Sequence, residues 1–97
     1  MVTPAAQVSF ECSISARDDG TLEAVYLQVA QGQAERTVEV IQDILMADYD
    51  AAGNLLGFEL LAPVKLADIL EVVDPPIRQP FQRFVEKAAP RELVTPG

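Results

Sequence analysis

The residues that come closest to a known chemical pattern form an acidic stretch, ADYDAAGNLLGFELL, at positions 47 to 61. Its acidic residues and one glycine occupy the first, third, sixth and twelfth positions of the calcium-loop pattern D-x-[DN]-x-[DN]-G-x5-E: Asp48, Asp50, Gly53 and Glu59. The fifth position is Ala52, where the pattern has Asp or Asn. Carboxylate oxygens of Asp48, Asp50 and Glu59 are therefore a candidate site for a divalent cation.

The same stretch also fits a plain β-hairpin, and we favour that interpretation. A calcium loop of this type needs flanking helices to aim its ligands, but the residues after Asp48 include Gly57 and Pro63. In a hairpin, Asp48 and Glu59 would lie on opposing strands. Asp50 would cap the turn by accepting a backbone N–H bond, and Gly53 would take the left-handed conformation that closes it.

Other catalytic chemistry has few candidates. The chain has no histidine and one cysteine, so it lacks the usual general base and a pair of thiolates for zinc. Cys12 lies on the apolar side of its predicted strand and is expected in the core. Its acidic neighbours would raise the pKa of the thiol. A carboxylate pair among Glu39, Asp48 and Glu59 could replace histidine, but solvated surface carboxylates are the favoured interpretation. These observations favour a non-enzymatic protein without excluding an enzyme, and no cofactor is expected.

Length and charge restrict the class of protein. Ninety-seven residues, 49% of them hydrophobic, fit one domain over 1–97. The net charge is −8, and positions 1–63 hold ten acids and two bases. An acidic surface repels phosphate backbones, so no direct nucleic-acid binding is expected. A start without a basic flank and apolar block, and the lack of an apolar run of about 20 residues, favour a cytoplasmic protein with no membrane contact.

Hydropathy patterns predict an α+β fold, in which an antiparallel β-meander of four to five strands is followed by two short C-terminal α-helices. Period-two alternation and turn signals place the strands within 8–62, in the segments 8–15, 21–29, 35–41, 44–50 and 55–61. Gln42 and Asp43 allow a reversal, with a continuous bent strand as the alternative. Spacing of three to four predicts a short helix over 64–73 and an amphipathic helix over 80–89. Prolines predict a rigid connector over 74–79, and 90–97 is expected to be a tail.

Two features of this pattern favour association with another chain. The second and fifth predicted strands are apolar on both sides, and two short helices can cover only one face of a sheet. We therefore expect a second copy to cover the remainder or to extend the sheet through an edge strand, which gives a homodimer. The helix face formed by Phe81, Phe84 and Val85 is most simply core, but it is also a candidate partner-binding surface.

The favoured function is a homodimeric interaction or regulatory module, whose acidic sheet region would suit a basic protein partner. One alternative is a small-ligand or divalent-cation-binding protein that uses the acidic hairpin. Another is a toxin-neutralising partner protein.

A family resemblance covers about residues 25–62. It consists of an aromatic strand (Val25-Tyr26-Leu27), a glycine turn (Gly32), an RT.EV strand (36–40), a D.D..G hairpin (48–53) and a G.E.L strand (57–60). In this order the motifs resemble a small, mostly bacterial family, domain of unknown function 2283. The N-terminal quarter departs from it, because a longer segment and an extra strand replace the family's acidic segment. The resemblance implies an antiparallel meander followed by helix and no assigned activity.

Overall fold

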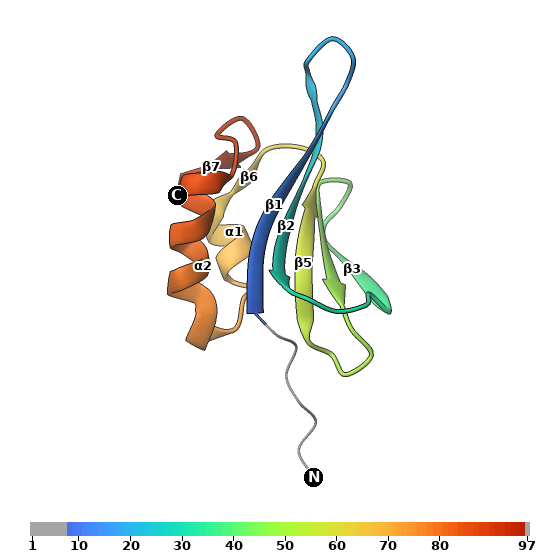
Figure 1. Ribbon diagram of the computed structural model, residues 1–97, viewed down its shortest axis with the longest axis vertical. Helices are drawn as coiled ribbons and strands as arrows, with labels where there is room; N and C mark the ends of the chain where they lie inside the picture. The colour runs from blue at the N-terminus through green and yellow to red at the C-terminus, as the bar shows by residue number, and fades with distance from the viewer. Residues whose placement is uncertain (1–7, 97) are drawn as a thin grey trace.

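The chain forms a five-stranded antiparallel sheet with helices on one of its faces (Figure 1). The computed structural model describes residues 8–96. In chain order, the elements are β1 (Val8–Ala16), β2 (Leu22–Ala30), β3 (Arg36–Ile41), β4 (Leu45–Tyr49), β5 (Leu55–Leu60), β6 (Val64–Lys65), α1 (Leu66–Leu70), α2 (Pro75–Ala88) and β7 (Val94–Thr95). The predicted α+β class, with an antiparallel sheet followed by helices, is confirmed.

The strand order is β1-β2-β5-β4-β3, so the sheet consists of the β1–β2 hairpin joined to a β3–β4–β5 meander. After β2, the loop at 31–35 carries the chain to the far edge before β3 begins, instead of continuing one meander. Burial explains this order. β5 is almost entirely buried and lies in the centre, whereas β3 is exposed along most of its length and lies at an edge.

The reversal between β3 and β4 forms without a glycine. Asp43 takes a left-handed backbone with φ 61°, which aspartate tolerates better than most residues. Ile44 N–H donates to the Ile41 carbonyl at 3.0 Å, and a Glu39 carboxylate oxygen accepts from Asp43 N–H at 3.1 Å. Of the two alternatives that the sequence left open at Gln42 and Asp43, the structure has the reversal.

The core lies between the sheet and the helices. Side chains from β2, β4 and β5 meet those of α1 and α2, and the largest fully buried ones are Phe58, Phe81, Leu27, Leu45, Leu60, Ile69, Val25, Val29, Val73 and Val85. No polar or charged side chain within residues 8–96 is classed as buried. None of the helices in this described part has the length and apolar character that spanning a bilayer requires.

The C-terminal third differs from the sequence prediction in three segments. The predicted 74–79 connector belongs mostly to α2, because Pro75 and Pro76 occupy the first helical turn, where no intrahelical N–H bond is needed. The predicted 64–73 helix is shorter, since β6 takes its first two residues and α1 ends at Leu70. The predicted 90–97 tail contains β7, which pairs in parallel with β6 and buries Leu93 and Val94.

Candidate functional site

The acidic hairpin contains a turn held by Asp50. Its Oδ1 accepts hydrogen bonds from the backbone N–H of Ala52 (3.0 Å) and Asn54 (2.8 Å), and its Oδ2 accepts from Asn54 Nδ2 (3.0 Å). Gly53 closes the turn with φ 86°. The hydrogen bonds from Asn54, and then those from the turn amides, lower the pKa of the Asp50 carboxyl. Asp50 therefore stabilises the turn, as the hairpin interpretation predicts.

Asp48 lies on β4, away from that turn, and accepts two side-chain hydrogen bonds. Thr37 Oγ1 on β3 donates to its Oδ1 at 2.6 Å, and the Tyr26 hydroxyl on β2 donates to its Oδ2 at 3.2 Å. Glu59 on β5 lies opposite Met46 and is exposed. The structure does not bring Asp48, Asp50 and Glu59 together as ligands. Within residues 8–96, no group of three or more His, Cys, Asp or Glu side chains is arranged to hold a metal ion.

Tyr26 reaches Asp48 across a glycine on the strand between them. A Cβ atom at Gly57 would lie 2.5 Å from the Tyr26 hydroxyl oxygen, 2.7 Å from its Cζ and 2.8 Å from the Leu27 carbonyl oxygen. The missing side chain at position 57 thus leaves the space that the phenol occupies. This contact was not predicted from the sequence. Its signal is a glycine inside an otherwise apolar strand, which often marks a close approach of another group.

The environment of Tyr26 keeps its phenol protonated. Burial, the charge and hydrogen bond of Asp48, and the charge of Glu59 raise the pKa of Tyr26 to about 12. At neutral pH the hydroxyl therefore acts as a hydrogen-bond donor and not as a base. The hydroxyls of Tyr26 and Thr37 both donate to the Asp48 carboxylate, so this carboxylate links β2, β3 and β4 and helps to fix their register.

We expect this network to make stability fall at high pH. An unfolded tyrosine ionises near pH 10, about two units below folded Tyr26, so the contribution is fully present below about pH 10 and is lost as the pH rises through about 12. The urea midpoint of the natural protein should fall more steeply over this range than that of Tyr26→Phe. Equal slopes for the two proteins would refute the assignment.

The sheet face opposite the helices is acidic. Strand register places two rows of residues on it, Glu11, Gln28, Gly57, Asp48 and Thr37 in one and Ser13, Tyr26, Glu59, Met46 and Glu39 in the other. These rows contain four carboxylates and neither lysine nor arginine. We call this surface the acidic face.

The expectation that both sheet faces are apolar is not met. A register shift between Asp48 and Tyr49 turns Leu55 to the helix side, where it borders Pro76 and Ile77. Leu56 is covered by the β2–β3 loop, since a Cβ at position 32 would lie 2.8 Å from its Cδ2. The two-sided apolar pattern of 55–61 thus results from a bulge and a covering loop, and the acidic face needs no apolar cover.

The edge strand β3 is exposed along most of its length. Its residues from Arg36 to Val40 are all exposed, and Val38 and Val40 retain 40% and 36% of their accessible surface. The Arg36 guanidinium lies over the ring of Tyr49, 5.1 Å from its centroid. This strand presents both apolar side chains and charges of both signs.

The proposed partner-binding residues on α2 belong to the core. Phe81 is fully buried and Val85 nearly so, while Phe84 is half-buried. The Phe81 ring makes an edge contact with Phe10 on β1 (centroids 5.1 Å apart) and lies 6.2 Å from Phe58 on β5. Phe81 and Val85 therefore pack on the chain's own sheet, as the core interpretation predicts, and the partner-binding alternative stays a prediction.

Cys12 also lies at the margin of the core. It is half-buried beside the cluster that β2 and β5 form. Burial raises the pKa of its thiol, which keeps the sulfur protonated and poorly nucleophilic. This position agrees with the predicted structural role.

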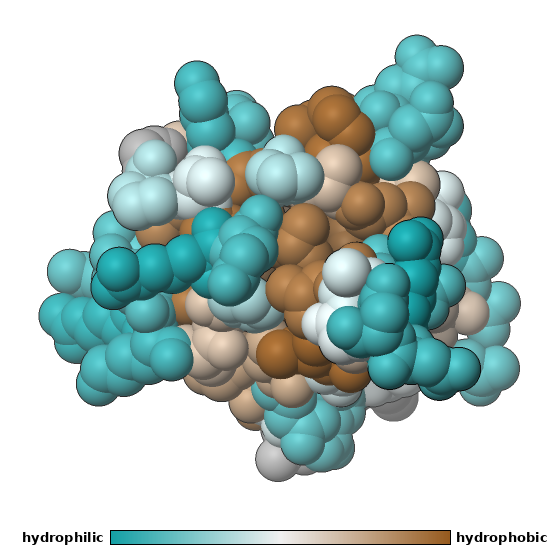
Figure 2. All heavy atoms as spheres, turned by 90° about the horizontal axis from the view of Figure 1, so that it is seen from above, coloured by the Kyte–Doolittle hydropathy of each residue, from teal (hydrophilic) through white to brown (hydrophobic). Residues whose placement is uncertain are grey.

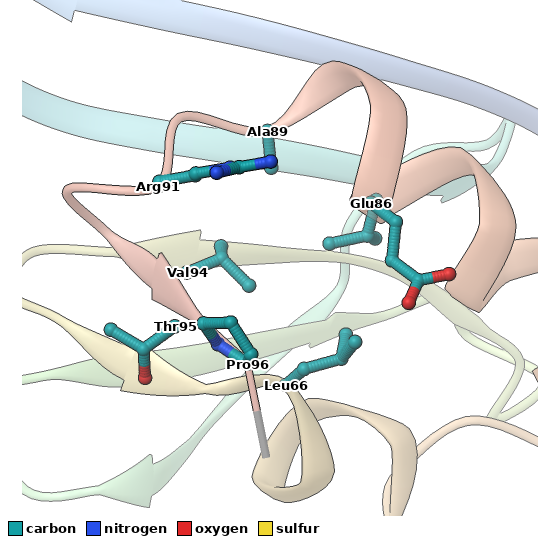
Figure 3. A pocket seen from close by; sticks show the side chains of 8 residues that line it. Leu66, Glu86, Ala89, Arg91, Val94, Thr95 and Pro96 are labelled. Carbon is teal, nitrogen blue, oxygen red and sulfur yellow. The ribbon is translucent and has the colours of Figure 1, made fainter.

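Two hollows outside the sheet could accept other groups. Figure 3 shows a pocket between α1, the end of α2 and β7, lined by Leu66 and Val94 and by the charged Glu86 and Arg91. Its volume is about 260 Å³. It lies below the range of about 300–1,000 Å³ typical of ligand sites.

The end of the molecule at the β1–β2 hairpin tip carries an apolar patch (Figure 2). There, a shallow depression is lined by Ile14, Leu22, Pro90 and Leu93 among others. Of the residues proposed from the sequence as site residues, Val85 lines the first hollow, and none of them lines the depression at the hairpin tip.

Comparisons with protein-family models, curated proteins and solved structures find no match to this chain. The resemblance to domain of unknown function 2283 therefore stays a prediction. The geometry described above is the basis for any functional proposal.

Proposed function

We propose that this chain is a non-enzymatic interaction module that acts as a homodimer. The observation that carries the proposal is β3, an edge strand whose outer side pairs with no strand within residues 8–96 and whose valines are exposed. Unpaired edge strands are templates for pairing with another chain. The side chains favour the non-enzymatic part of the proposal, because the Tyr26 hydroxyl is a protonated donor and the Asp48 carboxylate already accepts two hydrogen bonds.

Light scattering after size-exclusion chromatography tests the homodimer. At tens of micromolar, we expect a mass about twice the 10.5 kDa of one chain. A mass of one chain throughout this concentration range would refute the proposal. The measurement should be repeated at high salt, where pairing through backbone hydrogen bonds and valines should persist while purely ionic contacts weaken.

The acidic face supports a basic protein segment as the partner of this module. Four carboxylates without a neighbouring base on that face attract a cationic surface and repel an anionic one. An oligolysine peptide serves as the probe. We expect calorimetric binding at low salt that weakens with added salt and that falls several-fold in Glu39→Gln/Glu59→Gln.

The matched control for this titration is Glu86→Gln/Glu92→Gln. It removes the same charge from exposed positions on α2 and the turn that follows it, outside the acidic face. Equal weakening in the two double variants would show that net charge alone attracts the peptide and would remove the acidic face from the proposal.

A further inference from the structure

The strand β3 can meet a second copy only in certain registers. A continuous sheet with the helices of both copies on the same side requires a two-fold axis perpendicular to the sheet. This axis passes midway between one residue and the same residue of the second copy, so that this residue faces its own copy. The regular part of the strand runs from Arg36 to Glu39, because a register shift lies between Glu39 and Ile41. A bulge there ends regular pairing. The axis must therefore lie at one of four residues.

Charge decides between these four registers. An axis at Arg36 places two guanidinium groups opposite each other, and an axis at Glu39 does the same with two carboxylates. An axis at Thr37 sets Glu35 opposite Glu39 of the second copy. Like charges directly opposite in an antiparallel pair are destabilising. The axis at Val38 remains, since it sets Val38 against Val38 and Thr37 against Glu39 of the second copy, with no like pair.

The Val38 register also brings apolar surface together. Val38 pairs with Ala47, a fully buried core residue, so its side chain lies on the helix side of the sheet. It retains 40% of its accessible surface there, at the edge of the sheet. In the Val38 register, the valines of both copies would extend the core row across the junction, and the acidic faces would lie together on the opposite side.

We propose that two copies associate by antiparallel pairing of β3 about Val38, forming one sheet that continues through both. This inference rests on the proposed homodimer and adds its interface and register. It predicts which residues of the two copies lie opposite each other, and cross-linking measures that directly.

The test uses Val38→Cys in a Cys12→Ser background, so that each chain has one thiol. Directly opposite residues have Cβ atoms about 4.5–5.5 Å apart, close enough for a disulfide after small adjustments. Under mild oxidation, we expect a covalent dimer to form about ten-fold faster or more than in the control, because pairing holds the two thiols at a high effective concentration. The control is Ile14→Cys in the same background, at a 52% exposed position on the other edge strand.

The outcomes separate the inference from the function on which it rests. A light-scattering dimer whose Val38→Cys variant cross-links no faster than Ile14→Cys overturns pairing through β3 and leaves the homodimer intact. Faster linking of Ile14→Cys would instead place the contact at β1 or the neighbouring apolar patch. A protein that is monomeric at tens of micromolar overturns the proposed homodimer and this inference with it.

A second variant, Thr37→Lys, tests the register. With the axis at Val38, the new ammonium group faces Glu39 of the second copy at two symmetric places. The dimer dissociation constant should therefore fall about two- to ten-fold. With the axis at Thr37, two ammonium groups would oppose each other and the dimer would loosen. The control is Thr37→Val, which removes the same hydrogen bond to Asp48 without adding a charge. Loosening in Thr37→Lys beyond that in Thr37→Val overturns the Val38 register even if β3 forms the contact.

Discussion

Phe81→Ala is expected to lower the free energy of unfolding by about 3–5 kcal/mol, the usual cost of emptying a large buried aromatic site. Phe81 is fully buried, and its ring contacts Phe10 on β1 and approaches Phe58 on β5, so its removal leaves a cavity between α2 and the sheet. A domain of this size is stable by about 5–15 kcal/mol, so much of the total would be lost. Urea denaturation followed by far-ultraviolet circular dichroism measures the change.

The control for Phe81→Ala is Arg83→Ala on the same helix. Arg83 is exposed, and surface substitutions of this kind usually change stability by less than about 0.5 kcal/mol. If Phe81→Ala cost as little as Arg83→Ala and also abolished the dimer, the helix face would be a partner-binding surface after all. Loss of stability with the dimer mass preserved at low denaturant would confirm the core role.

Gly57→Ala is expected to destabilise the protein by about 1–3 kcal/mol, the range for overpacking a filled site. In a strand, alanine normally stabilises relative to glycine by about 0.5–1 kcal/mol, so the sign is opposite to the usual one. The new methyl group would meet the Tyr26 hydroxyl at 2.5 Å and the Leu27 carbonyl oxygen at 2.8 Å, and the latter belongs to the backbone and cannot swing away. Displacing Tyr26 from Asp48 should also lower its pKa from about 12 towards the ordinary value.

Two measurements separate these contributions in Gly57→Ala. Ultraviolet titration of the phenols reports the pKa of Tyr26, and urea denaturation reports the stability. In a Tyr26→Ala background, Gly57→Ala should cost less, because only the contact with the Leu27 carbonyl remains. A Gly57→Ala protein more stable than the natural one would show that the phenol does not need the space above this glycine.

Local features of this chain were predictable from the sequence because neighbouring residues alone determine them. Alternation placed the strands, since side chains two apart share a face. The turn at Asp50 and Gly53 was predictable because a short carboxylate and a left-handed glycine act within a few residues. The position of Cys12 near the core followed from the apolar alternation of β1.

Other features depend on segments far apart in the chain. The sheet order places β5 beside β2, and this choice reflects how much apolar surface each strand can bury once all are present. Pro75 and Pro76 are compatible with a connector or with the start of a helix. The structure has the helix start, and the same helix buries Phe81 against β1 and β5. Pairing of β6 with β7 joins residues about thirty positions apart, which no local pattern reports.

The candidate site also combines features set by neighbouring residues with features set by distant segments of the chain. The sequence by itself determined which residues are acidic, which segments extend as strands and where the acidic hairpin turns, because these follow from residue type and short-range geometry. Only the tertiary structure decided that Asp48 accepts hydrogen bonds from Tyr26 and Thr37, and that β3 is an edge strand. Both depend on which strands become neighbours, and that is set by long-range packing of apolar side chains into one core.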